Sequence, residues 1–174
     1  MKRRDVIAGL GGLAVLGGGA GLALDVGDRG GQEAVEPLEL ETLDAPGSSA
    51  GAITVPERGR VTVLELFATW CTVCQSMMPE MAALQDAVGD EVQFLSVTNE
   101  PVGDTVTRAD IAEWWTSHDG DWTLAVDEDL GLTQRLDATG VPYTFVLDED
   151  NRIAWKHKGR STAAELEGIV REQL

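Results

Sequence analysis

The sequence predicts an α/β sandwich built around a mixed β-sheet. Residues 61–67 and 92–98 are apolar runs rich in β-branched side chains, which is typical of strands buried on both faces. Between them, residues 74–88 place apolar side chains at the three- and four-residue spacing of a helix. These side chains are Met77, Met81, Leu84 and Val88. A strand, a helix and a strand in succession form a βαβ unit, and 43% apolar residues in a chain of 174 suit one compact core.

A small accessory hairpin is predicted before this unit. Residues 37–43 alternate apolar and polar side chains, and residues 53–55 form a second short extended piece. The Gly47-Ser48-Ser49 region between them supplies turn residues.

Three elements are predicted to follow the βαβ unit. Residues 108–117 form a helix that Thr107 caps, with Asp110 three residues further on. Residues 123–126 are predicted as a short strand and residues 129–136 as a helix. The helix at 108–117 lengthens the connection between the two parts of the sheet.

The chain is predicted to end in a β-hairpin and a helix. Residues 143–147 and 152–158 are extended runs on either side of a polar turn at 148–151. The last helix begins at the capping pair Thr162 and Glu165. Its inward side chains are Leu166, Ile169 and Val170. From residue 61 onward, the predicted order of elements is β-α-β-α-β-α-β-β-α.

The first 24 residues have the pattern of an export signal or membrane anchor. A basic start at Lys2, Arg3 and Arg4 precedes residues 6–24, which carry no charge and include seven glycines. So many glycines make the stretch weakly hydrophobic, which favours a cleaved signal over a permanent anchor. The Arg3-Arg4 pair resembles a twin-arginine export signal. The expected location is therefore outside the cell or, if the segment is retained, the outer face of the membrane.

A polar, acidic linker is predicted at residues 25–36, followed by one domain at 37–174. The chain has 13 Lys and Arg against 30 Asp and Glu, a net charge of −17. Such a charge excludes nucleic acid or anionic lipid as a partner of the folded part. Beyond residue 24 the lysines are Lys156 and Lys158 alone, and this lysine-poor, carboxylate-rich composition resembles that of halophilic proteins.

The chemistry is predicted at Cys71 and Cys74, which lie between a buried strand and a helix. A disulfide across so short a ring stabilises the fold by only about 2 kcal/mol, so a structural role explains it poorly. At a helix N-terminus Cys71 is expected to be a thiolate nucleophile with a lowered pKa, and Cys74 the buried resolving thiol. Tetrahedral zinc needs four ligands, and besides these cysteines the chain offers only the distant His118 and His157 as nitrogen ligands. Neither a metal ion nor another cofactor is expected.

The Trp70-Cys71-x-x-Cys74 motif follows a buried strand, and Val141-Pro142 precedes a later one. This pattern resembles the thioredoxin superfamily and implies a thioredoxin fold, a three-layer α/β/α sandwich. The resemblance implies that Pro79 kinks the helix and that Pro142 follows a cis peptide bond beside the disulfide. Trp70, Val141 and Pro142 are then the substrate-binding residues, with the backbone of Val141 pairing with the substrate. Glu65 falls where thioredoxins keep a buried acid that shuttles a proton, and burial of a carboxyl on an apolar strand raises its pKa.

The N-terminal hairpin, the extra helix before Pro142 and the export signal narrow the resemblance to extracytoplasmic reductases of the TlpA and ResA type. This resemblance implies that the protein reduces disulfides in exported proteins, including haem-binding ones, and receives electrons from a membrane thiol donor. We expect the protein to be a monomer. Thr72 and Val73, between the cysteines, differ from the thioredoxin pair, so a disulfide-forming oxidant is the alternative. A thioredoxin-fold copper chaperone is a second alternative. The strand at 92–98 lacks the lysine that accompanies the buried acid in thioredoxin.

Overall fold

The computed structural model describes residues 33–174 as seven strands and four helices. The strands are β1 (Leu38–Thr42), β2 (Gly51–Val55), β3 (Thr62–Phe67), β4 (Gln93–Thr98), β5 (Thr123–Val126), β6 (Tyr143–Leu147) and β7 (Ile153–Lys158). The helices are α1 (Thr72–Val88), α2 (Arg108–Ser117), α3 (Gly131–Arg135) and α4 (Ala163–Arg171). The predicted export signal at 1–24 and linker residues 25–32 lie outside the described residues.

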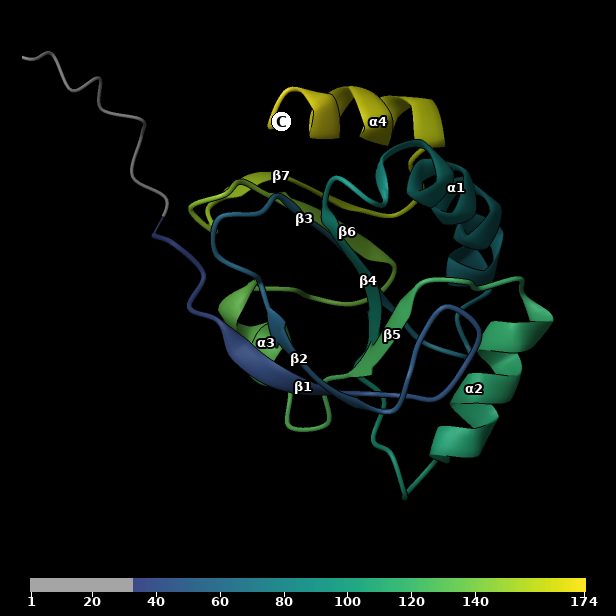
Figure 1. Ribbon diagram of the computed structural model, residues 1–174. Helices are drawn as coiled ribbons and strands as arrows, with labels where there is room; N and C mark the ends of the chain where they lie inside the picture. The colour runs from purple at the N-terminus through teal and green to yellow at the C-terminus, as the bar shows by residue number, and fades with distance from the viewer. Residues whose placement is uncertain (1–32) are drawn as a thin grey trace, which may run out of the picture. The chain divides into compact units, whose positions relative to one another are not determined.

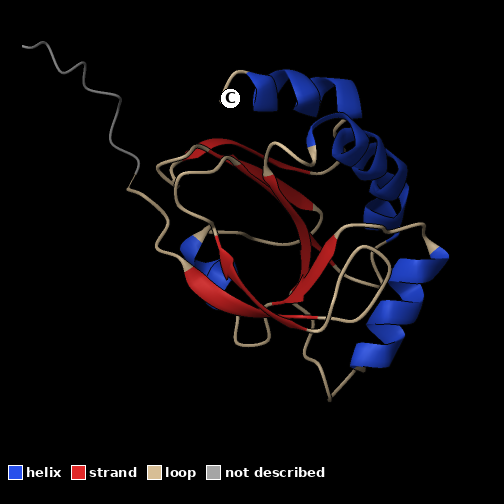
Figure 2. Cartoon of the chain, viewed as in Figure 1, coloured by secondary structure: helices blue, strands red, loops and turns tan. Residues whose placement is uncertain are grey.

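The strands form one mixed sheet in the order β2-β1-β5-β4-β3-β6-β7 (Figure 1). The central strands β3, β4 and β5 are parallel, and the outer strands pair antiparallel. Helices α1, α2 and α4 cover one face and α3 the other, as the colouring of Figure 2 also shows. The three-layer α/β/α sandwich predicted from the sequence is thereby confirmed.

The strand β3 separates two apolar clusters because its side chains alternate between the faces of the sheet. Val63 and Phe67 pack under α1, whereas Leu64 and Leu66 pack on the side of α3. All six residues of β3 are buried, as expected for a central strand. Glu65 shares the face of Val63 and Phe67, which places a carboxyl on the α1 side of the sheet.

The predicted N-terminal hairpin forms as β1 and β2, and it extends the main sheet. β1 pairs with β2 and also, through Glu41 and Thr42, with β5. Val35, within the segment expected as a linker, is buried and donates its backbone N–H to the carbonyl of Asn151 at 2.8 Å. The alternating side chains of residues 37–43 predicted a strand. They did not predict which strand would pair with its second edge.

Two helix boundaries differ from the prediction. Helix α1 begins at Thr72, two residues before the predicted start, because Cys71 is its N-cap. Helix α3 is shorter than predicted, because Leu130 takes a left-handed conformation with φ +62°. The carboxylate of Asp127 accepts the N–H groups of Leu132 and Thr133 instead, at 3.0 and 2.7 Å.

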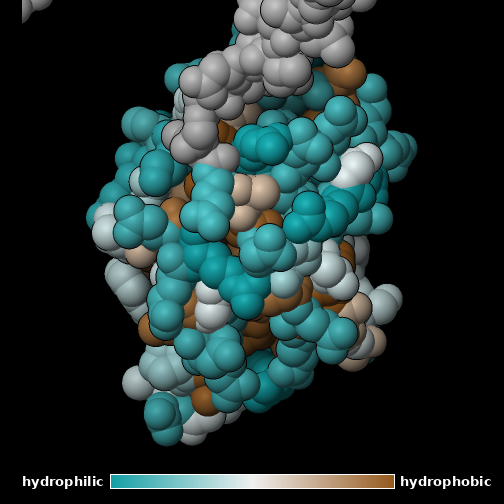
Figure 3. Space-filling view, turned by 90° about the vertical axis from the view of Figure 1, so that its left-hand side faces the viewer, coloured by the Kyte–Doolittle hydropathy of each residue, from teal (hydrophilic) through white to brown (hydrophobic). Residues whose placement is uncertain are grey.

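Hydrophilic residues dominate the face of the molecule shown in Figure 3, in keeping with the acidic composition.

None of the helices within residues 33–174 is long and apolar enough to cross a membrane.

Candidate active site

The loop between β3 and α1 holds the two cysteines in a disulfide. Cys71 is in an extended conformation at the N-cap, and its sulfur accepts the backbone N–H of Cys74 at 3.1 Å. Its carbonyl accepts the N–H of Gln75 and so starts the helix. Free N–H groups at a helix N-terminus stabilise negative charge, so this position suits a thiolate at Cys71.

The two cysteines differ slightly in their exposure to solvent. Cys74 is 1% exposed and Cys71 7%, so both are buried and Cys71 slightly less so. Trp70 and Val73 close to it in the chain are 73% and 40% exposed. Two exposed apolar side chains therefore lie near Cys71 along the chain.

The Val141-Pro142 peptide bond is cis, as the sequence resemblance implied. The pairing of β3 with β6 ends at Leu66 and Tyr143, so Val141 and Pro142 lie at the edge of the sheet where the cysteine loop leaves β3. The carbonyl of Pro142 accepts the N–H of Gly159 at 3.0 Å. Val141 lies beyond the last residue pair of the β3–β6 ladder.

Glu65 is fully buried on the α1 face, as predicted. Ser96, its neighbour in register on β4, donates its hydroxyl to Oε2 at 3.2 Å. Ser96 in turn accepts the indole N–H of Trp122 at 2.9 Å. Within residues 33–174, Oε1 of Glu65 has no hydrogen-bond partner, and neither has the hydroxyl of Thr144, which faces Glu65 in register from β6. Burial raises the pKa of Glu65 to about 8, and the hydrogen bond from Ser96 opposes that rise.

A second buried carboxylate, Glu100, holds the cysteine loop, and sequence reasoning missed it. It accepts the backbone N–H of Thr69 at 2.7 Å and the Thr69 hydroxyl at 2.9 Å. It also accepts the hydroxyl of Thr98 at 3.1 Å. Thr69 lies two residues before Cys71, so Glu100 fixes the segment that leads into the redox pair. The signal in the sequence was an acidic residue soon after an apolar strand, which alone is too common to assign.

Pro79 lies inside α1, as predicted, where its missing N–H leaves the carbonyl of Gln75 without the usual helical bond. Trp115 and Trp122 are buried in the core, and Trp114 stacks on Phe67 with ring centroids 5.1 Å apart. No group of three or more His, Cys, Asp or Glu side chains gathers as a metal site within residues 33–174.

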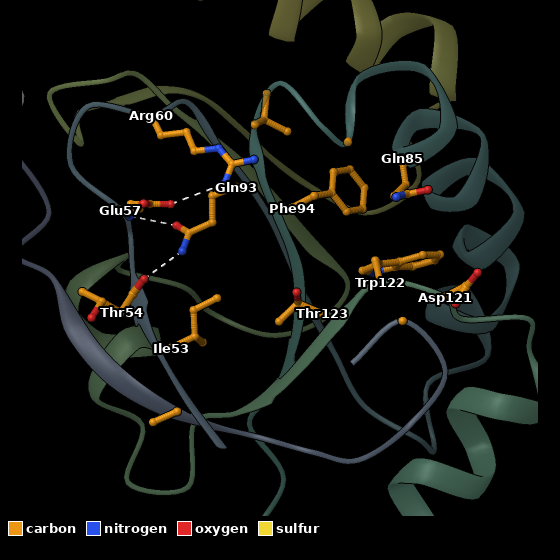
Figure 4. Close-up of a pocket in the computed structure, with 14 residues that line it drawn as sticks. Ile53, Thr54, Glu57, Arg60, Gln85, Gln93, Phe94, Asp121, Trp122 and Thr123 are labelled. Atoms are coloured by element: carbon orange, nitrogen blue, oxygen red, sulfur yellow. Dashed lines mark hydrogen bonds and ion pairs between the residues drawn. The ribbon is translucent and has the colours of Figure 1, made fainter. Parts of the chain in front are cut away.

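A cavity of about 620 Å³ lies at the other end of the sheet, near the start of β3 and β4 (Figure 4). Gln93 crosses it and accepts the N–H of Glu57 at 2.8 Å while donating to the carbonyl of Thr54 at 2.7 Å. These bonds join the β2–β3 connection to β4. The side chain of Gln93 thus ties neighbouring segments together at this cavity, away from the cysteines.

Comparison with known proteins agrees with this geometry. The chain is 28% identical over 145 residues to the thioredoxin-like protein YneN of Bacillus subtilis, covering 82% of this chain and 79% of YneN. It is 22% identical to the thiol-disulfide oxidoreductase ResA of Bacillus cereus, covering 66% of this chain and 64% of ResA.

The crystal structure of StoA from Bacillus subtilis superposes with a TM-score of 0.66 at 20% identity, covering 78% of this chain and 96% of StoA. The fold is thus a thioredoxin fold, as the sequence resemblance implied. The family model described as Redoxin matches residues 40–170. The chain, with its disulfide at the end of a central strand, therefore belongs to the Redoxin family.

Proposed function

We propose that this protein is an exported thiol-disulfide oxidoreductase that reduces disulfides in other exported proteins. The observation that carries the proposal is the Cys71–Cys74 disulfide at the N-terminus of α1, with Cys71 as the N-cap and Cys74 within the first turn of the helix. The relatives named thiol-disulfide oxidoreductase support the same chemistry.

The reaction consists of two exchanges in the reduced protein. The Cys71 thiolate attacks one sulfur of the substrate disulfide, forms a mixed disulfide and releases the other substrate sulfur as a thiolate. The Cys74 thiolate then attacks the sulfur of Cys71, which restores the Cys71–Cys74 bond and releases the second substrate thiolate. Two electrons pass to the substrate, and a dithiol donor returns two electrons to the protein.

Glu65 is proposed as the proton acceptor for Cys74. The inner cysteine is buried, so its proton needs an acceptor inside the protein before it can attack. Glu65 lies on the face of the sheet that α1 covers, and its pKa of about 8 is near the value that transfer to and from a thiol requires.

Trp70, Val141 and Pro142 are proposed to hold the substrate chain. The exposed indole of Trp70 supplies apolar contact beside Cys71. The backbone of Val141 pairs with an extended substrate segment, as in β-strand addition. Together they hold the substrate sulfur in line with the Cys71 sulfur, which is the geometry that exchange needs.

Residues 1–24 are proposed to direct export, and a membrane dithiol is proposed as the electron donor. The basic start and uncharged stretch of this segment support export.

The test of the redox assignment is equilibration of the full chain against a glutathione series, with Cys71→Ser and Cys74→Ser as controls. A reversible two-electron couple below the glutathione potential is expected for a reductase. A potential well above it would assign the protein to disulfide formation. No reversible couple would overturn the redox assignment altogether.

The test of Glu65 is the lifetime of the mixed disulfide. In Glu65→Gln the release of substrate by Cys74 is expected to slow by about tenfold to a hundredfold near neutral pH, while attack by Cys71 is unchanged. Equal rates of both steps in the variant and the wild type would remove Glu65 from the reaction.

A further inference from the structure

A small group of basic side chains stands out on this acidic molecule. Among the Lys and Arg residues of the described part, those with an ion pair are Arg58, Arg60, Arg108, Arg152 and Arg171. Those that form none within residues 33–174 are Arg135, Lys156, Lys158 and Arg160. Arg135 donates instead to the carbonyls of Glu36 and Pro37. The three others lie within five consecutive residues, and we call Lys156, Lys158 and Arg160 the basic strip.

The basic strip borders the substrate-binding loop. Lys158 pairs with Tyr143, the first residue of β6, and its ammonium group donates to the carbonyl of Thr139 at 2.6 Å. The next residue, Gly159, donates its N–H to the carbonyl of Pro142 at 3.0 Å. Arg160 follows directly and is exposed. The positive charge thus lies along the loop that contains Val141 and Pro142.

The strand that carries the strip is also an open edge of the sheet. β7 ends the strand order, so its outer side is paired with no other strand of the described chain. Lys156 and Lys158 are exposed on this strand, and Arg160 is exposed just beyond its end. Lys156 lines a cavity of about 590 Å³ together with Glu36 and Asp137. The strip therefore runs from this cavity toward the cis peptide bond, with Lys156 at one end and Arg160 at the other.

We propose that the basic strip binds an acidic segment flanking the disulfide of the substrate protein, a substrate class that rests on the function proposed above. A net charge of −17 repels an acidic partner at long range. A local run of unpaired cations beside the binding loop offsets that repulsion where the substrate chain must lie. At the strip itself, charge complementarity favours an acidic peptide. A basic peptide would be attracted instead to the acidic rest of the surface.

The experiment measures the rate constants with which the prereduced full chain reduces three disulfide peptides. The peptides differ only in the residues that flank the disulfide, which are a run of Glu, a run of Ser or a run of Lys. The test variant is Lys156→Glu with Arg160→Glu. Lys158 is left unchanged because it holds the Thr139 carbonyl. The matched control, Arg58→Glu with Arg60→Glu, changes the net charge equally, and both residues precede β3, at the opposite end of that strand from the cysteine loop.

The wild type is expected to react with the Glu peptide at least as fast as with the Ser peptide. In the test variant the ratio of the Glu to the Ser rate constant is expected to fall by about threefold to tenfold, and in the control to stay within about twofold. An equal fall in both variants, or no fall in either, would overturn the docking role and leave the lysines as protection of an open sheet edge. If the wild type reacted with none of the peptides, the proposed function itself would be overturned.

Discussion

Glu65 makes the stability of the protein depend on pH. Burial raises its pKa from the ordinary 4.5 to about 8, so the folded protein holds a proton there that the unfolded chain has already lost between these values. The free energy of unfolding is therefore expected to fall as the pH rises through this window. Below about pH 4.5 both states are protonated and the contribution is constant.

Glu65→Gln removes this dependence because the amide does not titrate. Relative to the wild type, the variant is expected to gain stability steadily between about pH 4.5 and 8, by at most about 1.4 kcal/mol for each pH unit. Urea unfolding of the oxidised protein from pH 4 to 9 measures this, since the cysteines then do not titrate. A difference between the two proteins that stays constant over this range would contradict the buried titration.

Ser96 bonds to the buried Glu65 and is itself bonded by Trp122. The indole N–H of Trp122 donates to the Ser96 oxygen, which leaves the Ser96 hydrogen for Glu65. Ser96→Ala is therefore expected to raise the pKa of Glu65 by about one unit. A pH titration of the Glu65 carboxyl group by carbon NMR measures this pKa. Thr144→Val is the matched control, because the Thr144 hydroxyl has no partner. An equal shift in both variants would mean that lost polarity alone, without the hydrogen bond, sets this pKa.

At the scale of elements, Glu100 joins the cysteine loop to the segment that follows β4. Glu100→Ala leaves two donors of Thr69 and one of Thr98 without this acceptor, and a loss of about 2 to 4 kcal/mol in the free energy of unfolding is expected. Hydrogen exchange at the Thr69 amide is expected to accelerate as well. Asp104→Ala, an exposed carboxylate in the same segment, serves as the control. Similar losses from both substitutions would show that Glu100 does not fix the loop.

Periodicity predicted most of the helices and strands, because apolar side chains must face one of the two clusters. It did not predict that β1 pairs with β5, because the apolar pattern of a strand does not identify which other strand lies along each of its edges. The start of α1 depends on the Cys71 sulfur as a cap, a role more usual for Ser, Thr, Asp or Asn. The left-handed Leu130 that delays α3 leaves no mark in the pattern of apolar residues.

For the active site, spacing along the chain was sufficient where the chemistry is local. Cys71 and Cys74 follow from one short motif, and Glu65 was placed by its distance from them. Ser96 and Glu100 were missed because their partners are 31 residues away and meet them only through strand register and loop closure. Contacts of this kind are set by tertiary structure, to which a single sequence gives no direct access.

For the whole molecule, the net charge of −17 predicts a stability that depends on salt. Repulsion among exposed carboxylates destabilises the compact state, and salt screens it, with a Debye length of about 10 Å at 0.1 M and 3 Å at 1 M. The urea midpoint is therefore expected to rise with NaCl and to level off near about 1 M. A control variant replaces exposed carboxylates by amides: Glu39→Gln, Asp86→Asn, Glu113→Gln and Glu149→Gln. Its midpoint should start higher and rise less, because less repulsion remains to be screened. If both proteins gained equally from salt, the gain would come from general strengthening of apolar burial, and the acidic surface would not be the cause.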